Sequence, residues 1–142
     1  MIGGVVAGYL VMAALVFFSF TVLYRLLGAE GTFKSGSYEV KGAWIAATLV
    51  VNLAAAVLGG VVSVSVGRVL KSATILSSAV LVVGLVTVVR TMNRTEPWPL
   101  RLSAVSDLHA AQNAREPTWI SFCNPLLGAA GVLLGARLKK PS

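Results

Sequence analysis

The sequence predicts an all-α integral membrane bundle of four transmembrane helices, and three observations carry this prediction. First, 56% of the 142 residues are hydrophobic and only 12% are charged, about half the charged fraction of an ordinary soluble domain. Second, the apolar residues form runs of about 18 residues or more, which match a hydrocarbon layer about 30 Å thick. Third, aromatic or basic residues flank these runs, as they do at membrane interfaces. We expect a single membrane domain covering residues 1–142.

The first expected span covers about residues 2–24 and contains two glycines four residues apart, Gly4 and Gly8. Small residues at this spacing let a second helix backbone approach closely. Tyr24 and Arg25 form an interfacial end to the run. The run has no basic start and is longer than a signal-peptide core, so we expect it to be retained. The Gly- and Ser-rich segment 28–42 then predicts an exposed turn, with a short extended piece near residues 37–40.

The second expected span covers about residues 43–64, and Trp44 opens it as an interface anchor. Asn52 lies near its middle, and a carboxamide in hydrocarbon is costly unless it is hydrogen-bonded, so we expect Asn52 to face protein. Gly59 and Ser63 belong to a stripe of small residues that recurs every four positions. This stripe is the best candidate for a tight helix crossing.

The third expected span covers about residues 73–90 and follows a link of only a few residues, 67–71. So short a link forces the second and third spans into an antiparallel hairpin. Ser77 and Ser78 can bond to the preceding helical turn, so they require no partner on another helix. The following loop, 91–117, is the longest polar segment, and we expect a short amphipathic helix within it, lying on the membrane and ending at Ala114.

The fourth expected span covers about residues 118–136, with Trp119 as its anchor. Asn124 and Pro125 interrupt it one turn in, because proline removes a backbone hydrogen bond and can kink the helix. Gly131 and Gly135 keep the rest of the span thin.

Four spans place both termini on one side of the membrane. That side carries five cations and no acids in short segments, whereas the other side carries seven cations and all five acids. The total count of cations opposes a cytoplasmic location for the termini, but short basic loops weigh more in orientation. We therefore expect both termini in the cytoplasm of a bacterial inner membrane.

No motif in the sequence defines a reaction. His109 is the single histidine, and one histidine with Asp107 and Glu116 nearby does not supply the usual metal or catalytic set. Cys123 is the single cysteine, so it cannot form an internal disulfide. We expect no catalytic residues, no metal and no cofactor. The net charge of +7 is explained by residues at the ends of spans, so we expect no nucleic-acid partner.

Several segments resemble small multi-pass bacterial membrane proteins of uncharacterised function. The resemblance lies in Pro117-Thr118-Trp119, in Asn124-Pro125 with the glycine-rich run to Arg137, and in the regions 24–33 and 44–60. It implies a bacterial inner-membrane location and supplies no activity or site residue.

The main functional hypothesis is a non-enzymatic membrane protein that acts through helix packing, as an accessory subunit or a homo-oligomer. Its partners would be the lipid bilayer, other membrane subunits or copies of itself. The alternative is a small channel or transporter for a small solute, although ionisable residues are absent from the inner parts of the runs; an enzyme using the third loop is a remote third hypothesis. The residues that we single out for helix packing or intramembrane polar contacts are Gly4, Gly8, Asn52, Gly59, Ser63, Asn124, Pro125, Gly131 and Gly135.

Overall fold

The computed structural model describes residues 1–94 and 115–139. They form the helices α1 (Ile2–Thr32), α2 (Gly42–Gly67), α3 (Leu70–Met92) and α5 (Thr118–Leu138). The shortest of these has 21 residues and spans about 32 Å at 1.5 Å per residue. Each helix is therefore long enough, and apolar enough, to cross a membrane. The all-α class is confirmed for the described residues, while the short helix expected before Ala114 lies outside them.

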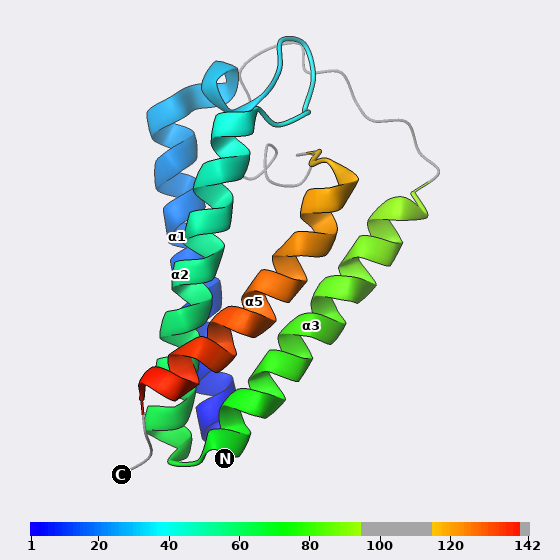
Figure 1. Ribbon diagram of the computed structural model, residues 1–142. Coiled ribbons are helices and arrows are strands. Elements are labelled where there is room, and N and C mark those ends of the chain that lie inside the picture. Colours follow the sequence, from blue (N-terminus) through cyan, green and yellow to red (C-terminus); the bar gives the residue numbers. More distant parts are fainter. Residues whose placement is uncertain (95–114, 140–142) are drawn as a thin grey trace.

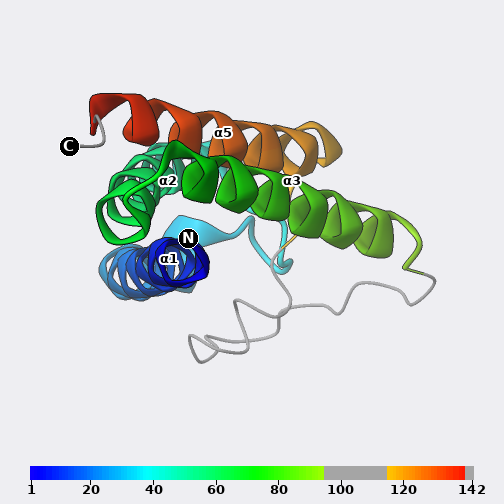
Figure 2. The same ribbon diagram turned by 90° about the horizontal axis from the view of Figure 1, so that it is seen from below.

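The four helices run alternately up and down (Figure 1). Helix α2 packs against α1 and against α5, and α5 packs in turn against α3. The N-terminus, the end of α5 and the α2–α3 turn lie at one end of the bundle, which we call the terminal end. The α1–α2 connection and the start of α5 lie at the other, which we call the loop end (Figure 1). Helix α3 leans away from α1 toward the loop end, as both views show (Figures 1 and 2).

The predicted hairpin of α2 and α3 is present, and its link is shorter than expected. Only Arg68 and Val69 separate the two helices, and Arg68 adopts the left-handed conformation with φ 56°. The Ser72 hydroxyl donates to the Ser63 carbonyl across the turn at 2.9 Å. The two helices are thus joined firmly at the terminal end, and α5 occupies the space into which they diverge.

Small residues bring the backbones of α1 and α2 together. A Cβ atom added to Gly4 would overlap the Ser63 carbonyl and the Gly67 backbone, and one added to Gly8 would lie 2.7 Å from the Gly59 carbonyl oxygen. A side chain at either glycine would therefore separate the helices. This close approach is the geometry that small residues four apart permit.

The contact between α2 and α5 is equally close. A Cβ atom on Gly60 would lie 2.9 Å from the Val132 carbonyl carbon, and one on Gly135 would lie 2.8 Å from the Val57 carbonyl carbon. A Cβ atom on Gly131 would lie 2.7 Å from the Ala56 Cβ atom. Because the nearest atoms at Gly60 and Gly135 belong to backbone, they cannot rotate away to admit a larger residue.

Helix α1 continues beyond the expected end at residue 24 and reaches Thr32. The extra turns contain Leu26 and Leu27, and a break at Gly28 with φ 67° and ψ 178° redirects the chain. Glycine adopts this conformation readily, whereas residues with a Cβ essentially do not. Arg25 therefore does not end the helix, as the sequence interpretation assumed, and Gly28 bends it instead.

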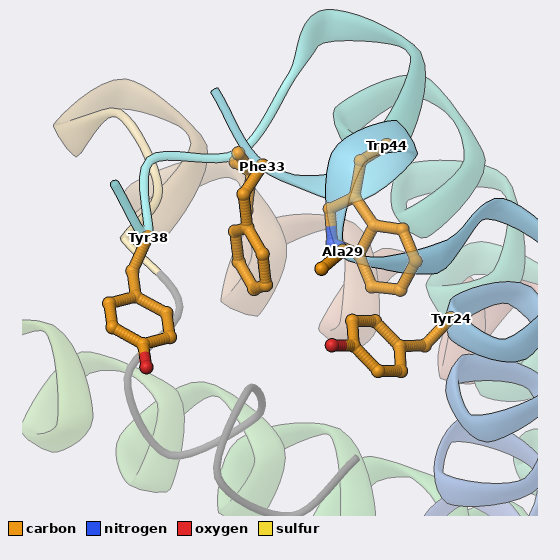
Figure 3. Close-up of a cluster of buried hydrophobic side chains, with 6 residues drawn as sticks. Tyr24, Ala29, Phe33, Tyr38 and Trp44 are labelled. Atoms are coloured by element: carbon orange, nitrogen blue, oxygen red, sulfur yellow. The ribbon is translucent and has the colours of Figure 1, made fainter. Parts of the chain in front are cut away.

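The segment between α1 and α2 is only partly the exposed turn that we expected. Phe33 and Val40 pair as an antiparallel bridge, so the expected extended piece is present. However, Phe33, Tyr38 and Val40 are at most 3% exposed. They pack with Tyr24, Ala29 and Trp44 (Figure 3), and we call these six residues the aromatic cap.

Burial in the aromatic cap changes the interpretation of two expected interface anchors. Tyr24 and Trp44 are each 8% exposed, and the Trp44 ring lies 5.8 Å from that of Phe20. Both rings are therefore covered almost entirely by other residues of the protein, and little of either ring reaches the surface. Trp119, by contrast, is 59% exposed and is available at the surface of α5.

Candidate functional site

A groove of about 970 Å³ opens where α3 leans away from α1. This volume lies at the upper end of the range for small-molecule sites, about 300–1,000 Å³. Residues of α1 and α3 form its walls, and residues of α2 and α5 form its floor. On the straight part of α1, before the bend at Gly28, the lining residues run from Tyr9 to Arg25, so the groove extends for about 24 Å along that part of the helix.

Most of the groove wall is apolar. Met12, Val16, Phe17 and Phe20 contribute from one side, and Val83 contributes from the other. Phe17 is 73% exposed and Val83 is 56% exposed. The groove is therefore open along one side, and nothing in the described residues seals it.

Polar side chains meet in the part of the groove nearer the loop end. The Asn52 amide of α2 donates to the Asn124 carboxamide oxygen of α5 at 3.1 Å. The Asn124 amide in turn donates to a Glu116 carboxylate oxygen at 3.3 Å. We call this chain of two hydrogen bonds the Glu116–Asn124–Asn52 relay; all three of its residues line the groove.

Burial of Glu116 has an electrostatic consequence. Desolvation raises the pKa of the Glu116 carboxyl above its ordinary value, because burial penalises the charged form. Glu116 precedes the first residue of α5 by two positions, so it forms the end of the relay nearest the loop end of the bundle. The Glu116 carboxyl is thus partly shielded from water. The α5 side chain that donates a hydrogen bond to it is the Asn124 amide.

Pro125 shapes the groove next to Asn124. It packs against α3 where Gly84 leaves room, since a Cβ atom on Gly84 would lie 2.8 Å from the Pro125 Cγ atom. A proline nitrogen cannot donate a hydrogen bond, so the carbonyl of Ser121, four residues earlier, lacks its usual helical donor. Ser121 also lines the groove.

Thr32 contributes a further polar group to the groove. Its side chain is 1% exposed, and its hydroxyl has no hydrogen-bond partner within the described part of the chain. A buried polar group without a partner costs free energy. Thr32 is therefore a buried hydroxyl, without a partner among the described residues, next to the loop end of the groove.

The predicted site residues fall into two groups in the structure. Gly4, Gly8, Gly59 and Ser63 meet at the α1–α2 crossing, and Gly131 and Gly135 meet α2 from α5. Asn52, Asn124 and Pro125 instead line the groove. All of the small-residue stripes named above are therefore occupied by contacts within the chain.

Three groups escaped the sequence interpretation. Glu116 belongs to the predicted loop and precedes α5, and the sequence does not show that the Asn124 amide comes within hydrogen-bonding distance of it. Nothing in the sequence distinguishes Thr32 from other surface threonines. The sequence requires no partner for Ser77 on another helix, yet its hydroxyl donates across to the Ala129 carbonyl of α5 at 3.0 Å.

Metal ligands do not gather in this groove. Across residues 1–94 and 115–139, no three His, Cys, Asp or Glu side chains lie close enough together to hold an ion. The hydrogen-bonding side chains that line the groove include amides, hydroxyls, the Arg25 guanidinium and the half-buried Glu116 carboxyl. Such groups orient a ligand by hydrogen bonds or by charge.

Fold and site together define an all-α protein with four long apolar helices and a side-opening groove that is apolar along most of its length and polar toward one end. Comparisons with protein-family models, with curated proteins and with solved structures found no match. The function is therefore argued from the residues of the chain.

Proposed function

We propose that this chain is a non-enzymatic, four-span protein of a bacterial inner membrane that acts as an accessory subunit or as a homo-oligomer. The observation that carries this proposal is the apolar surface of α1. Only 6% of its most apolar 18-residue stretch is buried, and Leu10, Phe18 and Leu26 are 60%, 69% and 77% exposed. A water-soluble monomer rarely tolerates such a continuous apolar surface, whereas lipid or a partner helix covers it readily.

The orientation that we propose places both termini in the cytoplasm. The terminal end of the bundle carries Arg68, Lys71, Arg137 and Lys139 within short segments, and short basic segments favour the cytoplasmic side. The loop end, with the aromatic cap and Glu116, would then lie at the outer face of the membrane.

The partner contact cannot use the small-residue stripes, because these are occupied within the chain. It would use large side chains on the outer faces of α1 and α5, such as Phe18, Trp119 and Phe122, which are 69%, 59% and 41% exposed. Aromatic residues are enriched among the residues that dominate protein interfaces.

The experiment that tests this function is purification of the tagged full chain in a mild detergent, followed by mass measurement of the intact particle. A stoichiometric partner, or a defined number of copies, is expected. A particle of one chain per detergent micelle, at protein concentrations that match the native membrane, would contradict the proposal. Phe18→Ala should weaken the assembly, whereas Ser19→Ala on the same turn is the control.

The relay favours one second candidate, a path for a small neutral solute. Asn52 and Asn124 bond to each other, as a packing role requires, but they also line the groove. Solute flux into proteoliposomes that falls in Asn52→Leu, while the melting temperature stays unchanged, would support a transport role. Equal flux in wild-type and empty vesicles for a panel of small neutral solutes would exclude it.

A further inference from the structure

We infer that the groove holds one acyl chain of a bilayer phospholipid, with a primary-amine headgroup placed at the Glu116 end. This inference rests on the proposed membrane location and names the ligand class of the groove. The shape of the groove, the order of polar and apolar groups along it, and its charge all suit such a lipid.

The shape of the groove suits a hydrocarbon chain. Among the described residues it is open on one side, and its length of about 24 Å along α1 exceeds the thickness of one hydrocarbon leaflet, about 15 Å. A chain entering sideways from the bilayer would meet Phe17 on α1 and Val83 on α3, both of which line the groove and are more than half exposed. Burial of apolar surface in a preformed apolar groove favours such a chain over water.

The order of groups along the groove suits an amphiphile. The apolar residues Met12 and Val80 lie on the walls nearer the terminal end, while Glu116 and Thr32 lie at the loop end. A lipid with its tail toward the middle of the bilayer and its head at the outer face has the same order.

Charge selects the headgroup. A carboxylate that is partly removed from water is stabilised by a nearby cation, and an ammonium group at the end of a lipid headgroup supplies both charge and hydrogen-bond donors. A zwitterionic headgroup carrying an amine therefore complements this end better than an anionic one.

Two matched pairs of substitutions separate a groove lipid from the lipid that surrounds any membrane protein. Ala13 lines the groove, whereas its exposed neighbour Ala14 does not. On α3, Val83 lines the groove and Val82 does not, although they are similarly exposed, at 56% and 60%. Tryptophan at Ala13 or at Val83 would fill the groove, and tryptophan at Ala14 or at Val82 would add the same bulk elsewhere.

The test begins with membranes washed in alkaline carbonate, from which the tagged full chain is purified by mild detergent. Recovery of the chain in the wash would overturn the proposed membrane location, and the lipid inference with it. Retained lipid is then counted by mass spectrometry of the intact protein, and headgroups are identified after extraction. We expect about one phospholipid per chain, enriched in amine headgroups relative to the membrane.

The substitutions make this expectation decisive. Ala13→Trp should lower retained lipid at least tenfold while Ala14→Trp retains the wild-type amount; if Ala13→Trp fails to fold, Val83→Trp and Val82→Trp replace the pair. Glu116→Gln should keep the lipid and lose its enrichment in amine headgroups. The inference would be overturned if both members of a pair retained equal lipid, or if the wild-type headgroups matched the bulk membrane. It would also be overturned if a crosslinker placed at position 83 captured a stoichiometric protein in place of lipid.

Discussion

The contact between α2 and α5 yields the sharpest prediction, because two glycines meet backbone atoms there. Replacing Gly135 with alanine adds one methyl group, and the nearest atoms are the carbonyl oxygen and carbon of Val57. A carbonyl group in a helix cannot rotate aside, so the substitution can be accommodated only if α5 moves away from α2.

Two opposing effects set the magnitude. Alanine has a higher helix propensity than glycine by about 1 kcal/mol, which favours the variant. Overpacking of a close contact costs typically 1–3 kcal/mol, and separation of the helices also weakens the dispersion contacts along the crossing. We expect Gly135→Ala to lower the free energy of unfolding by about 1–2 kcal/mol, combining these terms.

Unfolding can be followed by titrating the purified chain from a mild detergent into sodium dodecyl sulfate while recording tryptophan fluorescence, to which the buried Trp44 contributes one of three tryptophans. Gly3→Ala is the matched control, since no atom lies within 4 Å of its added Cβ, and it should be neutral or stabilising by up to about 1 kcal/mol. Gly60→Ala should act like Gly135→Ala. The double variant should lose less free energy of unfolding than the sum of the losses in the two single variants, because one displacement of α5 relieves both contacts.

The reasoning would be refuted if Gly135→Ala were as stable as Gly3→Ala. That result would mean that the two backbones lie further apart than the structure places them. An additive double variant would refute the narrower claim that Gly60 and Gly135 respond to the same movement of α5.

Three further predictions concern the relay, the carboxyl and the bend in α1. Asn52→Leu leaves the Asn124 carboxamide oxygen without its donor and should destabilise the chain by about 0.6 kcal/mol, with about 1.7 kcal/mol as an upper bound; a double-mutant cycle with Asn124→Leu that gives zero coupling would contradict this. The folded-state pKa of Glu116 is raised above 4.5, so the folded state binds more protons than the unfolded state. The contribution of Glu116 to stability should therefore be highest below about pH 4.5 and fall as pH rises through the interval up to the folded pKa. Glu116→Gln should remove this fall in urea or detergent titrations across that interval, and an unchanged pH profile would show that another group is responsible. Gly28→Ala forces a residue with a Cβ into φ 67° and ψ 178° and should cost about 1–3 kcal/mol; Gly42→Ala, whose Cβ meets no atom within 4 Å, should not, and equal stability of the two would argue against strain at Gly28.

The helices were predictable because their signal is long and uniform. Runs of apolar residues fix the existence and approximate ends of α2, α3 and α5, which the structure extends by only a few residues. The end of α1 was not predictable in the same way. Arg25 resembles a terminus, and the sequence alone does not reveal that Gly28 bends the chain while Leu26 and Leu27 continue the helix.

The site was only partly predictable, for a physical reason. The cost of a buried amide predicts that Asn52 seeks a protein partner, and Asn124 on a parallel span is a natural one. Ser77 and Thr32 are different, because a hydroxyl can bond within its own helix, and only the placement of neighbouring helices decides whether it does. Burial of Glu116 also depends on the packing of α5 against α2, which no local pattern specifies.

The pairing of Arg115 with the α1–α2 connection has a consequence for the order of assembly. The Val40 amide donates to the Arg115 carbonyl at 3.0 Å, and the Arg115 amide donates to the Tyr38 carbonyl at 2.8 Å. When the chain is synthesised from its N-terminus, the Val40 amide and the Tyr38 carbonyl lack these hydrogen bonds until Arg115, about 75 residues later, has been synthesised. The first two helices thus expose an unpaired backbone edge of the kind that invites association with other chains, and the arrival of the last helix closes it.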